Sequence, residues 1–392
     1  MIFWEDKYPD RGNNRVVLIA EYCDSRINST GLYWQQIAEK LAVNMRVTIV
    51  SPKVHSDLVD IGCDIKKFAP QSVFLSRFFP EKLHNFFRLI LALFSTSIQG
   101  TNVIVGTNPL FLPLLIPYFK LARVKSLTLL CYDLFPQNLM TQAGPILHFL
   151  LRALSKVYAK AYKLCDNVVV VGRDMKQEVL EIGIPETQIH YIPNWGPRNH
   201  KCCANVNDDV AGQLRILFFG NLGRFQAIPE LLEQIIRVQR RDVEFIFVGD
   251  GENRNKIKEI AQQDSRIKYL DGIPMSDRDN IYESAHISFV SVHRGMKGLC
   301  VPSKSYFALA NQHPILALVE KDSEIDILCE EFQCGWRIDI DRHDSLSAIL
   351  DEIDKQEYLS KVRNIADISE DLLNGTYSLT LIENLVFGYA DS

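Results

Sequence analysis

The chain has 392 residues, of which 47% are hydrophobic and 23% are charged, and its formal net charge at pH 7 is −5. A chain of this length and composition predicts a globular protein of two domains and excludes disordered and fibrous proteins. The acidic balance also argues against a nucleic-acid-binding protein, because such proteins usually carry an excess of basic residues.

Short apolar strands alternate with helical segments along the first half of the chain. A helix is predicted at 31–42, and strands are predicted at 15–22, 46–52, 101–108, 126–133 and 167–172. Such alternation is typical of βα units, in which helices cover a parallel sheet. We therefore expect a Rossmann-like N-terminal domain at 1–195.

Two apolar stretches, 72–98 and 109–123, stand out in this half, yet neither contains a run long enough to span a bilayer. They could be core helices joined by a loop. Alternatively, 74–94 could rest on a membrane surface through four aromatic side chains with basic neighbours, namely Phe78, Phe79, Phe86 and Phe87. Periodicity does not distinguish a buried face from a lipid-facing one, so both interpretations stay open.

The alternation of strands and helices begins again after residue 213. Residues 196–213 between the two halves are polar and rich in Asn, Asp and Gly, which indicates a linker. A second Rossmann-like domain is therefore expected at 214–375, followed by a helix at 376–392. Considered alone, this final helix could pack on the second domain. The predicted fold class is α/β, with two doubly wound parallel sheets.

Nine cysteines are scattered along the chain without a C-x-x-C pair or a zinc-binding spacing. This pattern is typical of reduced thiols in a cytoplasmic protein, and it predicts no metal site. The N-terminal residues also lack the basic and apolar regions of a signal peptide. We therefore expect a cytoplasmic protein.

Gly-containing turns at three places could let a phosphate approach the backbone. Ligands of doubly wound sheets bind at the carboxyl ends of the strands, next to helix N-termini. In each place a simple cap or turn is the alternative interpretation. The candidate contacts are Gly31, Asn221, Arg224, Gly249, Asp250 and Gly251.

The loop and helix at 291–310 indicate an anion site more clearly. Lys304 falls in the first turn of the predicted helix, where the partial positive charge favours an anion, and residues 298–319 contain no acid. Ser303 is a suitable N-cap for this helix. The segment supplies three cations, Arg294, Lys297 and Lys304. The sequence therefore predicts a bound diphosphate, with Lys304 and Arg224 on either side of it.

Asp133 is the candidate for acid–base chemistry in the first domain. It follows a predicted strand and precedes a Pro-containing turn, so it could accept a proton from a hydroxyl or merely cap the turn. The chain contains no P-loop, no nucleophile elbow, no zinc-protease motif and no acidic cluster with metal spacing.

Six segments, taken in register, resemble glycosyltransferase family 4, whose members have the GT-B fold of two Rossmann-like domains facing a cleft. The resemblance is closest to bacterial transferases that build O-antigens, exopolysaccharides and glycolipids. The segments are "GTNPLFLPLL", "DLFPQNL", "GIPETQIHYIPNW", "FFGNLGR", "FVGDG" and "VPSKSYFALANQHPILA".

This resemblance implies transfer of a sugar from a nucleoside diphosphate sugar, most often UDP-linked, to a lipid-linked or glycan acceptor. It also implies retention of anomeric configuration, with no cofactor and no metal. Arg224 and Lys304 would stabilise the leaving diphosphate, and Asp133 would position the acceptor. The last helix would cross back to the first domain.

The resemblance also implies further contacts to the donor. Gly31 would approach the diphosphate from the first domain, and the backbone at Ile273 would contact the base. The backbone of the loop before Ser303 would contact the sugar and the β-phosphate, through Gly298, Leu299, Cys300 and Val301.

The chain departs from the commoner family pattern at two places. Leu299 and Phe307 occupy the positions of a Glu-x7-Glu pair, so recognition of the ribose must differ. Asn221 and Gln226 stand where many members have a basic pair. A catalytically degenerate partner subunit and a nucleotide-sugar epimerase are the alternatives, and contact with the inner face of the plasma membrane stays open.

Overall fold

The computed structural model describes residues 14–66, 89–197, 212–271 and 278–388. Ile273, the four Phe side chains of segment 74–94 and most of the expected linker lie outside these residues. The chain divides into two compact units, one of 1–171, 175–192 and 379–392, the other of 172–174 and 193–378. The expected domain boundaries at 195, 214 and 376 stay predictions.

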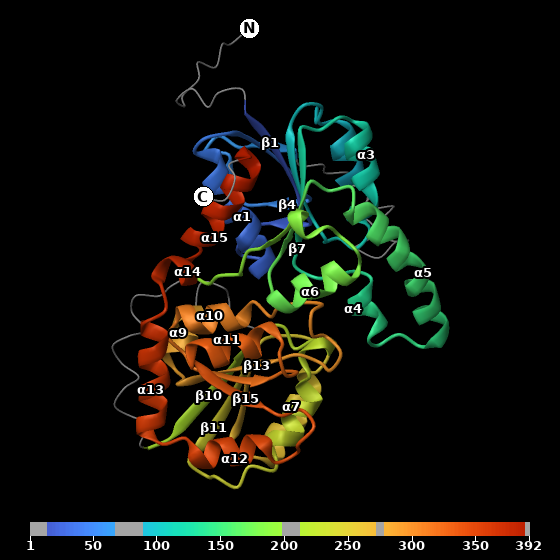
Figure 1. The fold of residues 1–392 in the computed structure, drawn as a ribbon. Helices are drawn as coiled ribbons and strands as arrows, with labels where there is room; N and C mark the ends of the chain where they lie inside the picture. The colour runs from blue at the N-terminus through green and yellow to red at the C-terminus, as the bar shows by residue number, and fades with distance from the viewer. Residues whose placement is uncertain (1–13, 67–88, 198–211, 272–277, 389–392) are drawn as a thin grey trace. The chain divides into compact units, whose positions relative to one another are not determined.

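The first unit is built on a seven-stranded parallel sheet with the strand order β5-β3-β1-β6-β7-β8-β9. Its central strands are mostly apolar because helices cover both faces of the sheet (Figure 1). The strands are β1 (Arg15–Ile19), β3 (Arg46–Val50), β5 (Asp64–Lys66), β6 (Asn102–Gly106), β7 (Ser126–Cys131), β8 (Asn167–Val170) and β9 (Ile189–Tyr191). Short β2 (Tyr22–Cys23) pairs with β4 (Lys53–Val54).

The helices of this unit follow the strands in the expected order. Buried Leu112, Ile116 and Phe119 show that the apolar stretch 109–123 contributes to the core. Among the described residues the helical elements are α1 (Ser29–Ala42), η1 (Ser56–Leu58), η3 (Leu112–Leu115), α3 (Ile116–Leu121), α4 (Gln137–Met140), α5 (Pro145–Tyr162), α6 (Arg173–Glu181) and η4 (Glu186–Gln188). The first two residues of α6 belong to the second unit.

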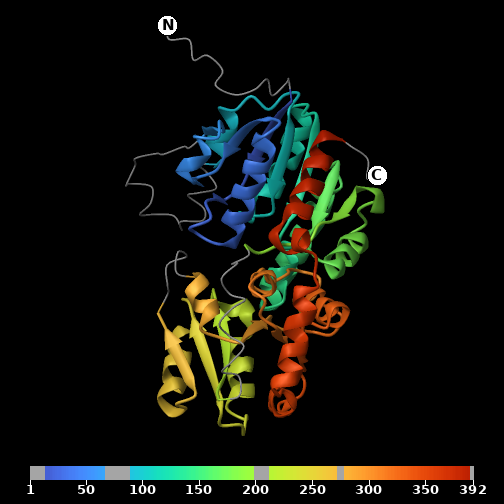
Figure 2. The ribbon, with the colours of Figure 1, turned by 90° about the vertical axis from the view of Figure 1, so that its left-hand side faces the viewer.

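The last helix, α15 (Thr376–Phe387), joins the first unit from residue 379 onward and lies beside its strands (Figure 2). Its Glu383 accepts a hydrogen bond of 2.9 Å from the Asn44 side chain and pairs with Lys40 Nζ at 3.1 Å. Lys40 lies in the last turn of α1 and Asn44 directly follows this helix, so α15 packs on the first unit from residue 379 onward.

The second unit contains a six-stranded parallel sheet with the order β12-β11-β10-β13-β14-β15. Stacked aromatic rings fill its core, with 5.8 Å between the centroids of Phe218 and Phe247 and 5.9 Å between those of Phe245 and Phe289. The strands are β10 (Leu214–Phe219), β11 (Val243–Val248), β12 (Ile267–Leu270), β13 (Ile287–Ser291), β14 (Ile315–Leu318) and β15 (Gly335–Ile338).

Helices connect these strands, and the prediction of two doubly wound α/β sheets is confirmed. They are η5 (Arg224–Gln226), α7 (Ile228–Ile235), α8 (Arg254–Gln263), α9 (Arg278–Glu283), α10 (Lys304–Ala310), α11 (Glu324–Phe332), α12 (Ser345–Glu352), α13 (Lys355–Ala366) and α14 (Glu370–Asn374).

Strand order reverses between β10 and β13 in the second sheet, and between β1 and β6 in the first. Doubly wound sheets bind ligands at such reversals, where the loops after two neighbouring strands diverge and leave a crevice. The fold therefore indicates that the turn after β10 and the loop after β13 are the parts of the second unit that would bind a ligand.

Gly249, directly after β11, packs so closely on the turn after β10 that only glycine fits. Its φ is +143°, and a Cβ atom would lie 1.9 Å from the carbonyl oxygen of Gly220. Gly220 also has a positive φ, +126°, but a Cβ atom there would meet no atom within 4 Å.

We expect Gly249→Ala to lower the free energy of unfolding by at least about 3 kcal/mol, because it combines a steric clash with an unfavourable φ. Gly220→Ala is the matched control, and its cost should stay near ~1–2 kcal/mol, since it has the φ penalty alone. Denaturant unfolding of both variants measures the difference, and equal losses would contradict the close packing.

Candidate active site

Lys304, the first residue of α10, lies at the crevice between β10 and β13. Its Nζ donates a hydrogen bond to Oε1 of Gln226 and lies 3.9 Å from the ring centroid of Phe218, near the end of β10. The backbone oxygen of Gln226 in turn accepts a hydrogen bond from the hydroxyl of Ser291, the last residue of β13. The lysine is therefore held by side chains from the end of β10 and the turn after it, and Ser291 links that turn to the end of β13.

The half-buried ammonium of Lys304 has no carboxylate partner among the described residues. Loss of hydration lowers its pKa from 10.5 to about 7, although the Cys300 thiol opposes this shift. A buried cation of this kind is stabilised when an anion binds beside it. An anion bound beside Lys304 stays a prediction.

Arg224 lies two residues before Gln226, in the short helix η5. Its exposed guanidinium is 3.6 Å from a carboxylate oxygen of Glu252, which follows β11. Asn221, earlier in the same turn, is exposed. The structure therefore places Arg224 at the surface of the turn that also carries Gln226, and its role toward a diphosphate stays a prediction.

Gly249, Asp250 and Gly251 hold two loops together. The amide of Leu222 donates to the oxygen of Asp250 over 2.9 Å, and the Tyr269 hydroxyl donates to the oxygen of Gly249 over 2.8 Å. The Asp250 carboxylate accepts from the Gly251 amide and pairs with Arg254. These contacts give the three residues a structural role, and their contact with a donor stays a prediction.

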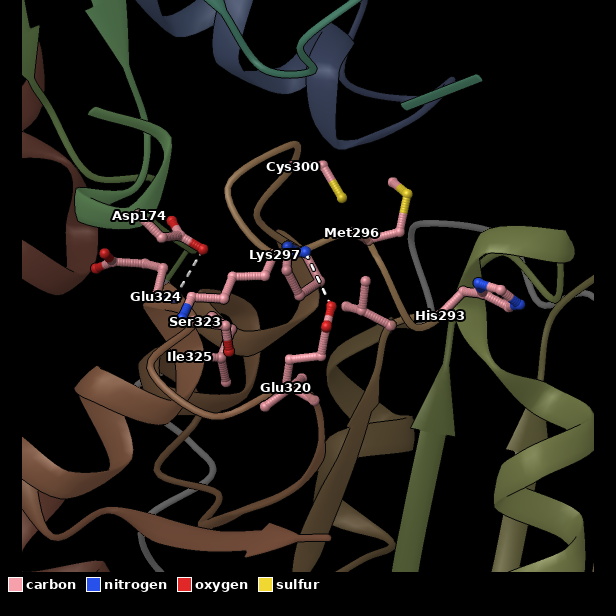
Figure 3. Close-up of a pocket in the computed structure, with 12 residues that line it drawn as sticks. Asp174, His293, Met296, Lys297, Cys300, Glu320, Ser323, Glu324 and Ile325 are labelled. Atoms are coloured by element: carbon pink, nitrogen blue, oxygen red, sulfur yellow. Dashed lines mark hydrogen bonds between the residues drawn. The ribbon is translucent and has the colours of Figure 1, made fainter. Parts of the chain in front are cut away.

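The loop after β13 is held by two carboxylates that the sequence analysis missed (Figure 3). Glu320 Oε2 accepts from the amides of Gly295 and Lys297 over 2.8 and 3.2 Å. Asp174 Oδ2 accepts from the amides of Gly298 and Glu324 over 2.9 and 3.1 Å. These carboxylates fix the course of the loop that leads to Lys304.

A signal for these acids was present in the sequence. Glu320 closely follows β14, and Asp174 closely follows β8, so both occupy the places where doubly wound folds carry functional side chains. They line one pocket together with His293, Met296, Cys300 and Ser323, among others (Figure 3).

The predicted backbone contacts of this loop are only partly available to a ligand. The amide of Gly298 donates to Asp174, and that of Leu299 donates to the oxygen of Met296 over 3.0 Å. Leu299 and Val301 point into the protein and are 7% exposed each.

Ser303 was expected to cap α10, and this expectation is wrong. The backbone of Ser303 is itself helical, with φ −56° and ψ −26°, and its side chain makes no capping hydrogen bond. An N-cap needs an extended backbone to direct its hydroxyl at the free amides of the first turn. The structure therefore assigns no side-chain cap to the start of α10.

Two of the three cations of the loop pair with acids. Arg294 pairs with Asp341, which follows β15, and Lys297 Nζ lies 3.8 Å from Asp322. The structure thus pairs Arg294 and Lys297 with acids at the surface, and Lys304 is the half-buried cation of the three.

The first unit has its own polar cluster, at the carboxyl ends of β6 and β7. The Asn108 side chain donates to Asp133 Oδ2 over 3.3 Å, and burial raises the pKa of Asp133. Within the described residues, three nearby buried oxygens have no hydrogen-bond partner, those of the side chains of Thr107, Gln137 and Asn138. Such oxygens are suited to a ligand that brings hydroxyl donors.

Gly31 lies in the first turn of α1, where its amide donates to the Asn28 side chain over 2.7 Å. A Cβ atom at Gly31 would lie 2.3 Å from the oxygen of Asp24, so the glycine allows close packing. The cap interpretation accounts for this amide, and contact with a diphosphate stays a prediction. The described residues contain no group of three or more His, Cys, Asp and Glu suited to a metal ion.

Both halves of the chain match models of glycosyltransferase families. Residues 30–195 match the model of Glycosyltransferase Family 4, and residues 213–325 match that of Glycosyl transferases group 1. The probable glycosyltransferase WbjE of Pseudomonas aeruginosa is 30% identical over 359 residues, which cover 86% of this chain and 89% of WbjE.

Two further proteins extend the comparison. AmsD of Erwinia amylovora, an amylovoran biosynthesis glycosyltransferase, is 24% identical over 246 residues, which are 62% of this chain and 64% of AmsD. HepE of Anabaena, solved in complex with UDP and glucose, has a TM-score of 0.69 at 14% identity and covers 95% of this chain and 99% of its own. The chain therefore belongs to glycosyltransferase family 4 and is a glycosyltransferase with the GT-B fold.

Proposed function

We propose that this glycosyltransferase moves a sugar from a UDP-sugar to a lipid-linked or glycan acceptor, in the synthesis of a surface polysaccharide or glycolipid. The observation that carries the proposal is Lys304, a half-buried cation at the strand reversal with no carboxylate beside it in the described structure. The complex of HepE with UDP and glucose supports the choice of donor, and the role of AmsD in amylovoran biosynthesis supports the choice of product.

Charge development during transfer explains the role of the basic groups. When the bond from the sugar to the diphosphate breaks, negative charge grows on the leaving oxygen and positive charge grows on the sugar ring. Lys304, held in place by Gln226 and Phe218, would stabilise the leaving group without needing to reorient. Arg224, exposed in the turn that also carries Gln226, would add a second positive charge.

Retention of configuration is part of the proposal. In a front-face reaction the acceptor hydroxyl attacks from the side that the diphosphate leaves, and the leaving phosphate can take up the hydroxyl proton. No protein nucleophile is then required. Asp133 would bind and orient the acceptor together with Asn108, and its raised pKa suits a group that exchanges hydrogen bonds with hydroxyls.

Peripheral contact of a cytoplasmic protein with the inner face of the plasma membrane is also part of the proposal, because a lipid-linked acceptor would be presented there. Among the described residues, no helix combines the length and the apolar character needed to cross a bilayer.

We expect Lys304→Ala to weaken UDP binding by about 10- to 100-fold, since a hydrogen bond to a charged group contributes ~1.5–3 kcal/mol. Calorimetric titration in the presence of a chelator measures this loss. Lys361→Ala is the matched control, because Lys361 Nζ also lies over an aromatic ring, that of Trp336, but belongs to α13.

Unchanged affinity in the Lys304 variant would contradict the assignment of the diphosphate site. Absence of UDP binding in the wild-type chain would favour the degenerate partner subunit instead.

The affinity for a nucleotide sugar should also depend on pH through Lys304. Its pKa is lowered to about 7 in the free protein, so the cation is present below that pH and is lost above it. Binding of an anion raises the pKa again, so affinity for UDP-glucose should fall by up to about tenfold per pH unit above 7.

UDP-glucose is the suitable probe because, unlike UDP, it has no terminal phosphate that titrates near neutral pH. Lys304→Arg is the control, because Arg stays protonated throughout this range, and its affinity should not vary with pH. Equal pH dependence in both proteins would show that another group titrates.

A further inference from the structure

Helix α5 carries an unusually exposed apolar surface. None of its first six residues is buried, and Ile146, Phe149 and Leu150 are 82%, 72% and 57% exposed. Further along, the helix is anchored by Tyr158, whose hydroxyl donates to the oxygen of Leu110, and by buried Tyr162. The N-terminal half therefore reaches away from the sheet of the first unit (Figure 1).

The exposed side chains of α5 form two parallel stripes. Ile146, Leu150, Ala153 and Val157 follow the spacing i, i+4, i+7, i+11, which places them along one face of a helix. Arg152, Lys156 and Lys160, with Lys163 just beyond, form a basic stripe beside it. With 18 residues, the helix would present these stripes over about 27 Å.

The charged side chains of α5 and of the residues next to it are all basic. Residues 134–165 contain no Asp or Glu, and none of the four cations pairs with a carboxylate in the part of the chain that the structure describes. The two acids that flank this segment have other partners. Asp166 forms an ion pair with Lys120 over 2.7 Å, and Asp133 accepts a hydrogen bond from Asn108. The surface that α5 offers is therefore both apolar and positively charged.

We propose that α5 is the element through which the protein docks on an anionic lipid bilayer. An amphipathic helix with apolar and basic stripes binds in the headgroup region, with its apolar side chains toward the acyl chains and its cations on lipid phosphates. A second copy of this chain fits less well, because two such basic faces would repel each other. The inference deepens the proposed membrane contact and rests on it.

The test is sedimentation of the full chain with vesicles of phosphatidylglycerol or of phosphatidylcholine. We expect binding to phosphatidylglycerol and at least about tenfold weaker binding to phosphatidylcholine, because the basic stripe needs anionic lipid. Arg152→Gln with Lys156→Gln should weaken binding about 25-fold, from about fivefold per cation. The triple variant Ile146→Ser, Phe149→Ser and Leu150→Ser should weaken it at least about tenfold.

The matched control is the double variant Val59→Ser and Ile236→Ser, which replaces exposed apolar residues outside α5. This variant should bind vesicles as the wild type does. All variants should keep the thermal midpoint of unfolding and the affinity for UDP, since the replaced side chains are exposed and lie outside the nucleotide site. UDP binding without vesicle binding would overturn the inference about α5 and leave the proposed donor site standing.

Three other results would overturn the inference. These are equal binding to both lipids, equal binding by the triple variant, and a concentration-dependent dimer in sedimentation velocity that the triple variant abolishes. Failure to bind UDP with vesicle binding intact would instead count against the proposed function.

Discussion

The candidate site depends on a cation held in place by neutral partners. The ammonium of Lys304 contacts an amide oxygen and an aromatic ring. These two neutral groups fix its position and reduce its hydration, and they do not neutralise its charge. A carboxylate in the place of Gln226 would neutralise the ammonium and weaken its electrostatic attraction for a phosphate. The hydrogen bond from Ser291 to Gln226 then connects this cation to the strand whose end forms the other wall of the crevice.

The parallel sheets could be predicted from the sequence because each strand leaves a local signal. Runs such as those at β6 and β10 are apolar at almost every position, which only a sheet covered on both faces explains. Lys304 could be found as well, since a cation in the first turn of a helix conflicts with the local electrostatics. Both inferences require only residues that lie close together in the sequence.

The rest of the site could not be predicted because its contacts join distant parts of the chain. Asp174 meets Gly298 across more than a hundred residues of sequence, and no local pattern shows which acid will accept that amide. Arg294 looked like a ligand for an anion, yet its partner Asp341 follows a different strand. The helical backbone of Ser303 likewise departs from what the N-cap propensity of serine predicts.

The way the chain passes between the two units limits how the protein can be divided. The first unit contains residues 379–392, and the second contains 172–174. A fragment that ends at residue 195 would lack Glu383, leaving Lys40 and Asn44 without the partner they have in the whole chain. Each unit therefore takes some of its contacts from sequence beyond its own main segment. A cut between residues 198 and 211 would separate Glu383 from Lys40 and Asn44 in the first unit, and Asp174 from Gly298 in the second.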